Sequence, residues 1–366
     1  MGRVSAAVAA LAALVALCAC GDPLVVIGDS PGIVRIVAGV PDQAGDSLAV
    51  RATESHLDTP LGLAADADGV VYIADHRNSR VLAVTSSREI EALVDHSDRA
   101  EEPRLHGPDG LALGSGELMI ADPDGHRVWR LEFESGTLAP IAGTGVRGSS
   151  ADSVTALEAD LDTPTGVAVG ADGVVYFSEF GAHRVRRIQP DGTLVTVAGA
   201  GIAGFSGDGG PATLARMRRP AGLAVCDGVL YIADSGNHRV RAVDLETSII
   251  STVAGQGVAG FSGDGGPADE AKLDTPLALA FSSGGHMLFI ADSDNHRVRV
   301  VSMQTLMIWT FAGTGDTDFN GDLLPAGETA LKDPRGIAVS PLDFLYISDS
   351  GHHIVRRAAV TFVATR

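Results

Sequence analysis

The residues best suited to chemistry in this 366-residue chain belong to a pattern that recurs six times. In each copy a carboxylate ends a short apolar run, and four or five residues later comes a histidine-arginine pair or a related pair. The carboxylates are Asp75, Asp122, Glu179, Asp234, Asp292 and Asp349. The histidines include His126, His183, His238 and His296. Carboxylates and imidazoles at a short spacing can exchange protons or ligate a metal ion.

The recurrence of this pattern favours a structural role over a catalytic one. A catalytic group is needed once, whereas these groups appear in every copy. An aspartate at the end of a strand can accept hydrogen bonds from the backbone amides of its own turn, and a nearby arginine can cap the arrangement. Histidines at equivalent positions of separate copies lie too far apart to share one ion at bond lengths near 2 Å. We therefore expect a turn network in each copy and no metal there.

The elements that carry these residues repeat with a period of about 56 residues. Each copy has a proline two residues before an apolar run. These prolines are Pro60, Pro108, Pro164, Pro220, Pro276 and Pro334. In the fourth copy we predict strands over residues 222–226, 229–233, 238–243 and 249–254. The second run is nearly all apolar, as in a strand buried on both faces. The third alternates apolar and charged residues, which predicts a half-exposed strand.

Six copies of four short antiparallel strands predict an all-β fold, a six-bladed β-propeller of four-stranded antiparallel blades. The last copy has three clear strands, and the segment IVRIVAG at residues 33–39 matches a fourth strand. We expect this N-terminal strand to complete the last blade and close the ring, which removes exposed strand edges. The propeller then covers residues 33–363.

Long loops between the copies repeat as well. Five of them span 19 residues: 39–57, 143–161, 199–217, 255–273 and 313–331. An alanine at the fourteenth position suggests one helical turn pinned to the propeller, and four loops have aspartate at the tenth position. One carboxylate per loop is few for Ca²⁺, which takes six to eight oxygen ligands. We expect these aspartates to cap backbone amides and expect no cofactor, with Ca²⁺ as the weaker alternative.

Two segments carry a family resemblance: YIADSGNHRVR at residues 231–241 and FIADSDNHRVR at residues 289–299. The loop GFSGDGGPA at residues 204–212 also recurs at residues 260–268. The chain resembles the NHL repeat family, and its arrangement is similar to the NHL propellers of teneurins and many bacterial surface proteins. The resemblance covers residues 33–360 and implies a six-bladed propeller. Because propellers host many unrelated activities, it does not fix the function.

The mouth of the central channel is the natural place for an enzyme site in such a fold. The residues after the repeated prolines should line it: Leu61, Asp109, Thr165, Ala221, Leu277 and Arg335. Only Asp109 and Arg335 are charged, and no Gly-x-Ser-x-Gly nucleophile motif occurs. This set favours a binding module over an enzyme. A propeller-type lyase or hydrolase, lactonase-like or amidating-lyase-like, is the alternative, and a purely structural envelope protein is the third.

The loop face of the propeller, formed by the long loops and the turns between second and third strands, is the expected partner surface. The shorter, charged loop at residues 95–106 breaks the symmetry and contributes His96 and His106. Trp129 and Trp309 replace the arginine or serine of other copies. Together with Asp109 and Arg335, these residues are the candidate partner-binding set.

The N-terminus indicates export. An apolar run over residues 4–17 is too short to span a membrane as a helix, and the segment LCAC that follows it resembles a bacterial lipobox. We predict a signal peptide over residues 1–19, lipidation of Cys20, and a tether over residues 20–32. Ordinary cleavage with Cys20 left free is the alternative. The expected location is a bacterial envelope membrane, reached through the lipid anchor only.

The net charge of −19 narrows the class of partner. A strongly acidic surface repels nucleic acid and anionic headgroups, so neither is expected to bind. The expected partner is a protein or a glycan in the cell envelope, and a basic partner is compatible with the charge.

Overall fold

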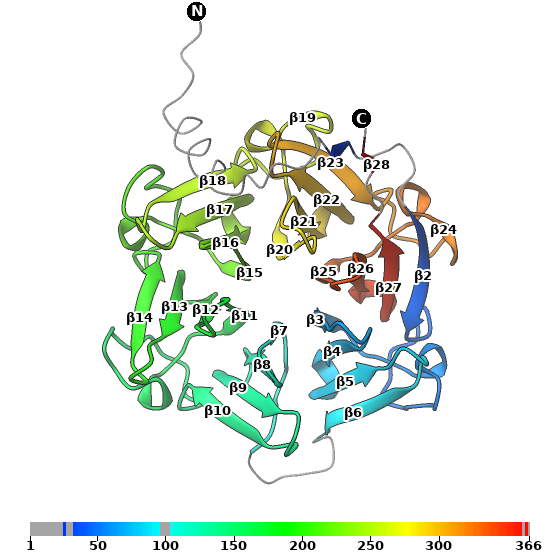
Figure 1. The fold of residues 1–366 in the computed structure, drawn as a ribbon, viewed down its shortest axis with the longest axis horizontal. Helices are drawn as coiled ribbons and strands as arrows, with labels where there is room; N and C mark the ends of the chain where they lie inside the picture. The colour runs from blue at the N-terminus through cyan, green and yellow to red at the C-terminus, as the bar shows by residue number, and fades with distance from the viewer. Residues whose placement is uncertain (1–24, 27–31, 96–102, 361–362, 365–366) are drawn as a thin grey trace, which may run out of the picture.

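The computed structural model describes residues 25–26, 32–95, 103–360 and 363–364. The apolar runs rich in Val, Ile, Leu, Tyr and Phe form short strands, as their composition predicts. Six sheets stand around a central channel like the blades of a propeller (Figure 1). The predicted all-β six-bladed architecture is confirmed.

The first three blades each have four antiparallel strands in chain order. Blade 1 contains β3 (Pro60–Ala65), β4 (Val71–Asp75), β5 (Arg80–Val84) and β6 (Ile90–Asp95). Blade 2 contains β7 (Leu111–Leu113), β8 (Glu117–Asp122), β9 (Arg127–Glu132) and β10 (Leu138–Ala142). Blade 3 contains β11 (Pro164–Val169), β12 (Val175–Glu179), β13 (Arg184–Ile188) and β14 (Leu194–Ala198).

The last three blades follow the same plan. Blade 4 contains β15 (Pro220–Cys226), β16 (Val229–Asp234), β17 (Arg239–Asp244) and β18 (Ile250–Ala254). Blade 5 contains β20 (Pro276–Phe281), β21 (Met287–Asp292), β22 (Arg297–Ser302) and β23 (Met307–Ala312), with β19 (Gly266–Pro267) at its outer edge. Blade 6 contains β25 (Pro334–Val339), β26 (Phe344–Asp349) and β27 (Ile354–Ala359).

The N-terminal strand β2 (Ile33–Ala38) completes blade 6. It pairs antiparallel with β27, with Arg35 opposite Arg357 and Ala38 opposite Val355. The short strand β24 (Leu324–Pro325) pairs with the other edge of β2. Outside the ring, β1 (Val25–Val26) pairs with β28 (Val363–Ala364). The predicted closure of the ring by an N-terminal strand is confirmed.

The core lies between neighbouring blades. Tyr231 and Val240 of blade 4, for example, pack in one cluster with Leu288 and Val301 of blade 5. The second strand of blades 1, 3, 4 and 5 is buried along its length, as its apolar sequence predicts. The predicted helical turns also form, as short 3-10 turns over residues 52–54, 156–158, 212–214, 268–270 and 326–328.

The expectation of a half-exposed third strand is wrong. The arginines of this strand that were read as solvent-facing are completely buried in four blades: Arg186, Arg241, Arg299 and Arg356. Each guanidinium bonds to a buried carboxylate of its own blade and to groups of the long loop. Pairing with these groups makes the burial of the charge possible.

Candidate functional site

The channel mouth is a ring built from the first strands of the six blades. In five blades a glycine lies against the carbonyl of the next blade, and a Cβ there would collide with it. Gly62 meets the carbonyl of Asp109, and Gly110 meets that of Thr165. The backbones of neighbouring blades approach too closely for a side chain between them, and the residues before three of these glycines, Asp109, Thr165 and Arg335, line the channel.

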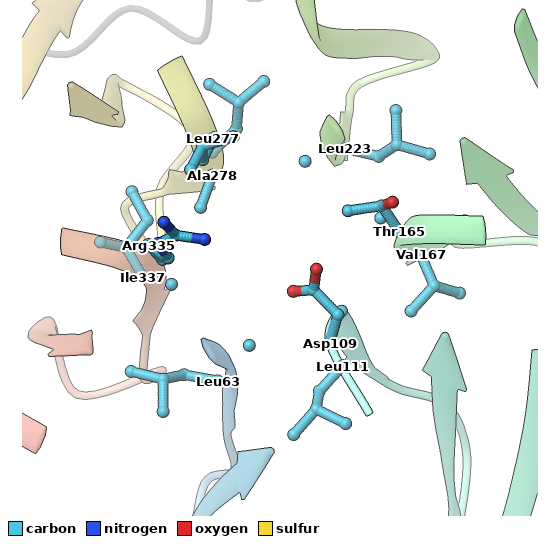
Figure 2. Close-up of a pocket in the computed structure, with 16 residues that line it drawn as sticks. Leu63, Asp109, Leu111, Thr165, Val167, Leu223, Leu277, Ala278, Arg335 and Ile337 are labelled. Atoms are coloured by element: carbon cyan, nitrogen blue, oxygen red, sulfur yellow. The ribbon is translucent and has the colours of Figure 1, made fainter. Parts of the chain in front are cut away.

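A cavity of about 60 Å³ opens at this ring. Four of the six residues predicted to line the mouth do so: Asp109, Thr165, Leu277 and Arg335. The other two, Leu61 and Ala221, are buried and lie outside the lining. Figure 2 shows the side chains of Asp109 and Arg335 entering the cavity from different blades and pointing toward one another.

Asp109 has an unusual electrostatic position. Burial raises the pKa of its carboxyl to about 6, against the opposing effects of the positive charges of His76 and Arg335, while Asp124 adds to the rise. Apart from Arg335 and the hydroxyl of Thr165, the rest of the cavity is lined by glycines and apolar side chains. The ionised form of Asp109 therefore carries a desolvation cost that the neighbouring charges offset only in part.

His76 was not identified from the sequence, although it stands beside this site. Its Nδ1 lies 3.3 Å from the carbonyl oxygen of Pro108, and its Nε2 lies 4.0 Å from a carboxylate oxygen of Asp124. At the equivalent position three blades have serine, and Ser293 donates to the carbonyl of Pro334 in the next blade. The histidine at a position where three other blades have serine is the sequence feature that could have identified His76.

The six repeated carboxylates are all completely buried. Each accepts a hydrogen bond from the backbone of the long loop that precedes its blade; for Asp234 the donor is the N–H of Arg218, at 2.7 Å. Asn237 donates to Asp234 and to the carbonyl of Gly204 in the loop. Arg241 then joins Asp234 to the loop carboxylate of Asp208. These groups tie the loop to the blade.

The loop aspartates contact protein groups. Asp152 accepts from the backbone and hydroxyl of Thr196, and Asp322 accepts from the backbone N–H of Ile36. Within the described ranges 25–26, 32–95, 103–360 and 363–364, no group of three or more His, Cys, Asp or Glu side chains is placed to hold a metal ion.

The repeated histidines link neighbouring blades. At each of the six equivalent positions the backbone has a left-handed conformation, with φ between 48° and 59°. In His183, His238 and His296 the Nδ1 atom accepts the backbone N–H of a residue at the start of the next blade. Blade 1 has Ser79 at this position, and its hydroxyl donates to the carbonyl of His106.

The fourth position of the long loops is apolar in three copies and acidic in two. Val146, Ile202 and Val258 occupy the same position in three consecutive loops, and each side chain is more than half exposed. The equivalent residues of the other two loops are Asp42 and Asp316. The three apolar residues follow β10, β14 and β18, neighbouring outer strands on one half of the ring (Figure 1). We call these three residues the apolar arc.

A groove of about 510 Å³ lies between blades 4 and 5, and its lining includes Gly255 and Gln256 of the loop that carries Val258. Phe205 forms part of its lining and is held in place by Arg239, whose guanidinium carbon is 3.6 Å from the ring centre. Exposed Asp269 and Glu270 also line it, with Met307 as an apolar neighbour. The groove thus combines apolar surface with negative charge.

The remaining candidate partner residues lie in different environments. Trp129 is buried, and its indole N–H donates to Asp122 at 3.1 Å, which argues against a place for Trp129 in a partner surface. Trp309 is half-buried on β23 and packs against the core of blades 5 and 6. His106 is half-buried, with its backbone N–H on Asp122. His96 lies outside the described residues. No single site contains all of the predicted residues.

Comparison with known families agrees with this geometry. The profile of the teneurin NHL domain matches residues 51–202, and the NHL repeat profile matches residues 217–242. The chain contains sequence that matches the NHL repeat, which confirms the resemblance to NHL propellers. The NHL repeat match at residues 217–242 contains the buried carboxylate of Asp234 together with Asn237 and Arg241 of blade 4.

Relatives of this NHL-repeat chain are larger proteins. It is 24% identical over 322 residues to NHL repeat-containing protein 2 of Homo sapiens, covering 78% of this chain and 44% of that protein. It is 26% identical over 333 residues to teneurin-4 of Mus musculus, covering 79% of this chain and 11% of that protein. The chain spans less than half the length of these curated relatives.

A solved structure shares the fold. An auxiliary nutrient binding protein from Bacteroides thetaiotaomicron superposes with a TM-score of 0.65 at 15% identity, covering 91% of this chain and 77% of that one. At this identity the likeness concerns the fold alone. In the part of this chain that the structure describes, no helix has the length and apolar character needed to cross a bilayer.

Proposed function

We propose that this NHL propeller is an extracytoplasmic, lipid-anchored scaffold that binds a protein or glycan of the cell envelope through the apolar arc on its loop face. The observation that carries the proposal is the apolar arc of Val146, Ile202 and Val258. Exposed β-branched side chains at one repeated position, on three consecutive loops, extend over a broader area than scattered apolar residues. A partner that covers them would gain from burying that area.

The groove between blades 4 and 5 favours a protein partner. Asp269 and Glu270 place two carboxylates beside Phe205 and Met307. A lysine or arginine next to an apolar residue would satisfy both features, and the net charge of −19 would speed its approach. The fold shared with an auxiliary nutrient binding protein is compatible with a binding role.

The membrane anchor is part of the proposal. Cys20 lies outside the described residues, and its support is the apolar run and the lipobox-like segment LCAC before Gly21. Metabolic labelling with a clickable fatty acid should mark the wild-type chain and leave Cys20→Ala unlabelled. Equal labelling of both chains would contradict lipidation at Cys20.

The binding proposal is tested with a variant carrying Val146→Ser, Ile202→Ser and Val258→Ser. Each change removes an exposed methyl-bearing side chain, so the fold should survive. We expect partner recovery from envelope extracts to fall at least several-fold. Leu342→Ser is the control, because Leu342 is also exposed but lies in the turn between β25 and β26, on the opposite face. Equal losses in both variants would contradict a role for the loop face.

A further inference from the structure

The two charged side chains of the channel mouth are arranged in an unexpected way. Asp109 and Arg335 come from blades 2 and 6 and enter the same cavity, pointing toward one another (Figure 2). In the described part of the chain, neither side chain has an ion pair within 4.0 Å or a hydrogen bond to another residue. Two opposite charges are thus held close to each other without forming a direct pair.

The surroundings of Asp109 leave its charge poorly compensated, whereas the side chain of Arg335 is exposed to solvent. The cavity lining consists of apolar side chains, glycine backbone, and the hydroxyl of Thr165. Burial raises the pKa of Asp109 to about 6, and the charge of Arg335 is among the influences that oppose the rise. Charges in such surroundings are stabilised most by a partner that contacts them directly.

The size of the cavity limits what such a partner can be. One ordered water needs about 10–15 Å³ of such volume, so a cavity of about 60 Å³ holds several waters or a small organic molecule. The molecule must present a cation to Asp109 and an anion to Arg335 at opposite ends. Thr165 uses its hydroxyl proton on the carbonyl of Thr163, so its oxygen remains an acceptor for the cationic end.

We propose that the channel mouth binds a small zwitterion of the α-amino acid class, with its ammonium group on Asp109 and Thr165 and its carboxylate on Arg335. Leu277 and Ile337 border the cavity and favour a short apolar side chain on the ligand. This site is separate from the apolar arc, so it stands or falls independently of the loop-face proposal.

The test uses the purified full-length wild-type chain and three probes in equilibrium binding measurements. L-alanine carries both charges, alanine amide lacks the carboxylate, and N-acetylalanine lacks the ammonium. We expect L-alanine to bind and each analogue to bind roughly 10- to 100-fold more weakly, as expected for loss of a hydrogen-bonded charge. Failure of L-alanine to bind, or equal binding of all three probes, would overturn the proposal.

Variants assign the two ends of the ligand. Asp109→Asn should abolish the preference for L-alanine over N-acetylalanine, and Arg335→Gln should abolish the preference over alanine amide. Glu134→Gln is the matched control, because it removes one negative charge from an exposed turn between β9 and β10. It should leave all three affinities unchanged. Unchanged preferences in Asp109→Asn and Arg335→Gln would also contradict the assignment.

Discussion

The backbone N–H of Thr59, at the start of the first blade, donates a hydrogen bond of 3.2 Å to Nδ1 of His353 in the last blade. The two residues are 294 positions apart, and their contact spans the junction at which the ring closes. This junction is therefore held by a side chain as well as by the strand pair of β2 and β27.

His353→Ala should destabilise the propeller by about 1 kcal/mol, because the partly buried N–H of Thr59 loses its acceptor. Urea unfolding of wild type and variant measures the difference. His56→Ala is the control, since the imidazole of His56 bonds to Ser47 and Gln43 of its own loop. An equal loss of unfolding free energy in both variants would show that the interblade hydrogen bond adds no measurable stability.

The stability of the junction between blades 3 and 4 should depend on pH through His183. Burial and the charge of Arg219 lower the pKa of His183, while Asp162 opposes them. A histidine whose folded pKa is depressed contributes stability that is present above its unfolded pKa, near 6.5, and is lost as the pH falls through the folded value. Protonation also removes the acceptor of the Arg219 N–H.

Urea midpoints measured between pH 7.5 and pH 5 should therefore fall more steeply for wild type than for His183→Gln. The two curves should converge at the acidic end, because the histidine no longer contributes there. Parallel curves across the whole range would show that His183 is not a titrating element of the fold.

Asp109→Asn should stabilise the protein at pH 7. The folded pKa of Asp109, about 6, lies above the ordinary carboxyl value, so the folded state loses stability as the pH rises from about 4 through 6. Replacing the carboxylate by a neutral amide removes that loss, which corresponds to about 1–3 kcal/mol. The gain should disappear below about pH 4, where both states are protonated.

Asp292→Asn is the informative contrast. Burial raises the pKa of Asp292 to about 6 as well, but this carboxylate accepts bonds from the Asp274 backbone, Asn295 and Arg299. Its replacement should destabilise the fold by about 3 kcal/mol or more, because Arg299 loses a buried counter-ion. The denaturant midpoint of unfolding at pH 7 should rise for Asp109→Asn and fall for Asp292→Asn.

Arg241→Ala should cost about 3–5 kcal/mol, since it leaves Asp234 buried without its ion pair and releases Asp208 of the loop. Arg216→Ala removes an exposed arginine of the same loop and should change the free energy of unfolding by less than about 0.5 kcal/mol. Similar midpoints for both variants would contradict the buried network.

The blade order and the closure of the ring could be predicted because both depend on local patterns. Pro220 and its equivalents mark each first strand, and the IVRIVAG segment at residues 33–39 has the sequence of a missing fourth strand. The burial of Arg241 could not be read in this way. An alternating strand looks the same whether its arginine faces water or reaches a carboxylate on a loop 33 residues away.

The candidate site was predictable only in part. Asp109 and Arg335 follow the repeated proline, so their place beside the channel could be derived from the period. The influence of His76 on Asp109 depends on how blade 1 packs against blade 2, which no local pattern records. Trp129 was expected on a surface because it replaces the arginine or serine of other copies, but its indole N–H is buried against Asp122 on a neighbouring strand of the same blade.

Site-specific photo-cross-linking in cells tests the loop-face account most directly. A photoreactive phenylalanine analogue replaces Ile202 of the apolar arc in one variant and Leu342 of the opposite face in another; the two side chains are 52% and 65% exposed. We predict a discrete cross-linked partner from position 202 and none from position 342. The reverse pattern, or the same partner from both positions, would contradict recognition through the loop face.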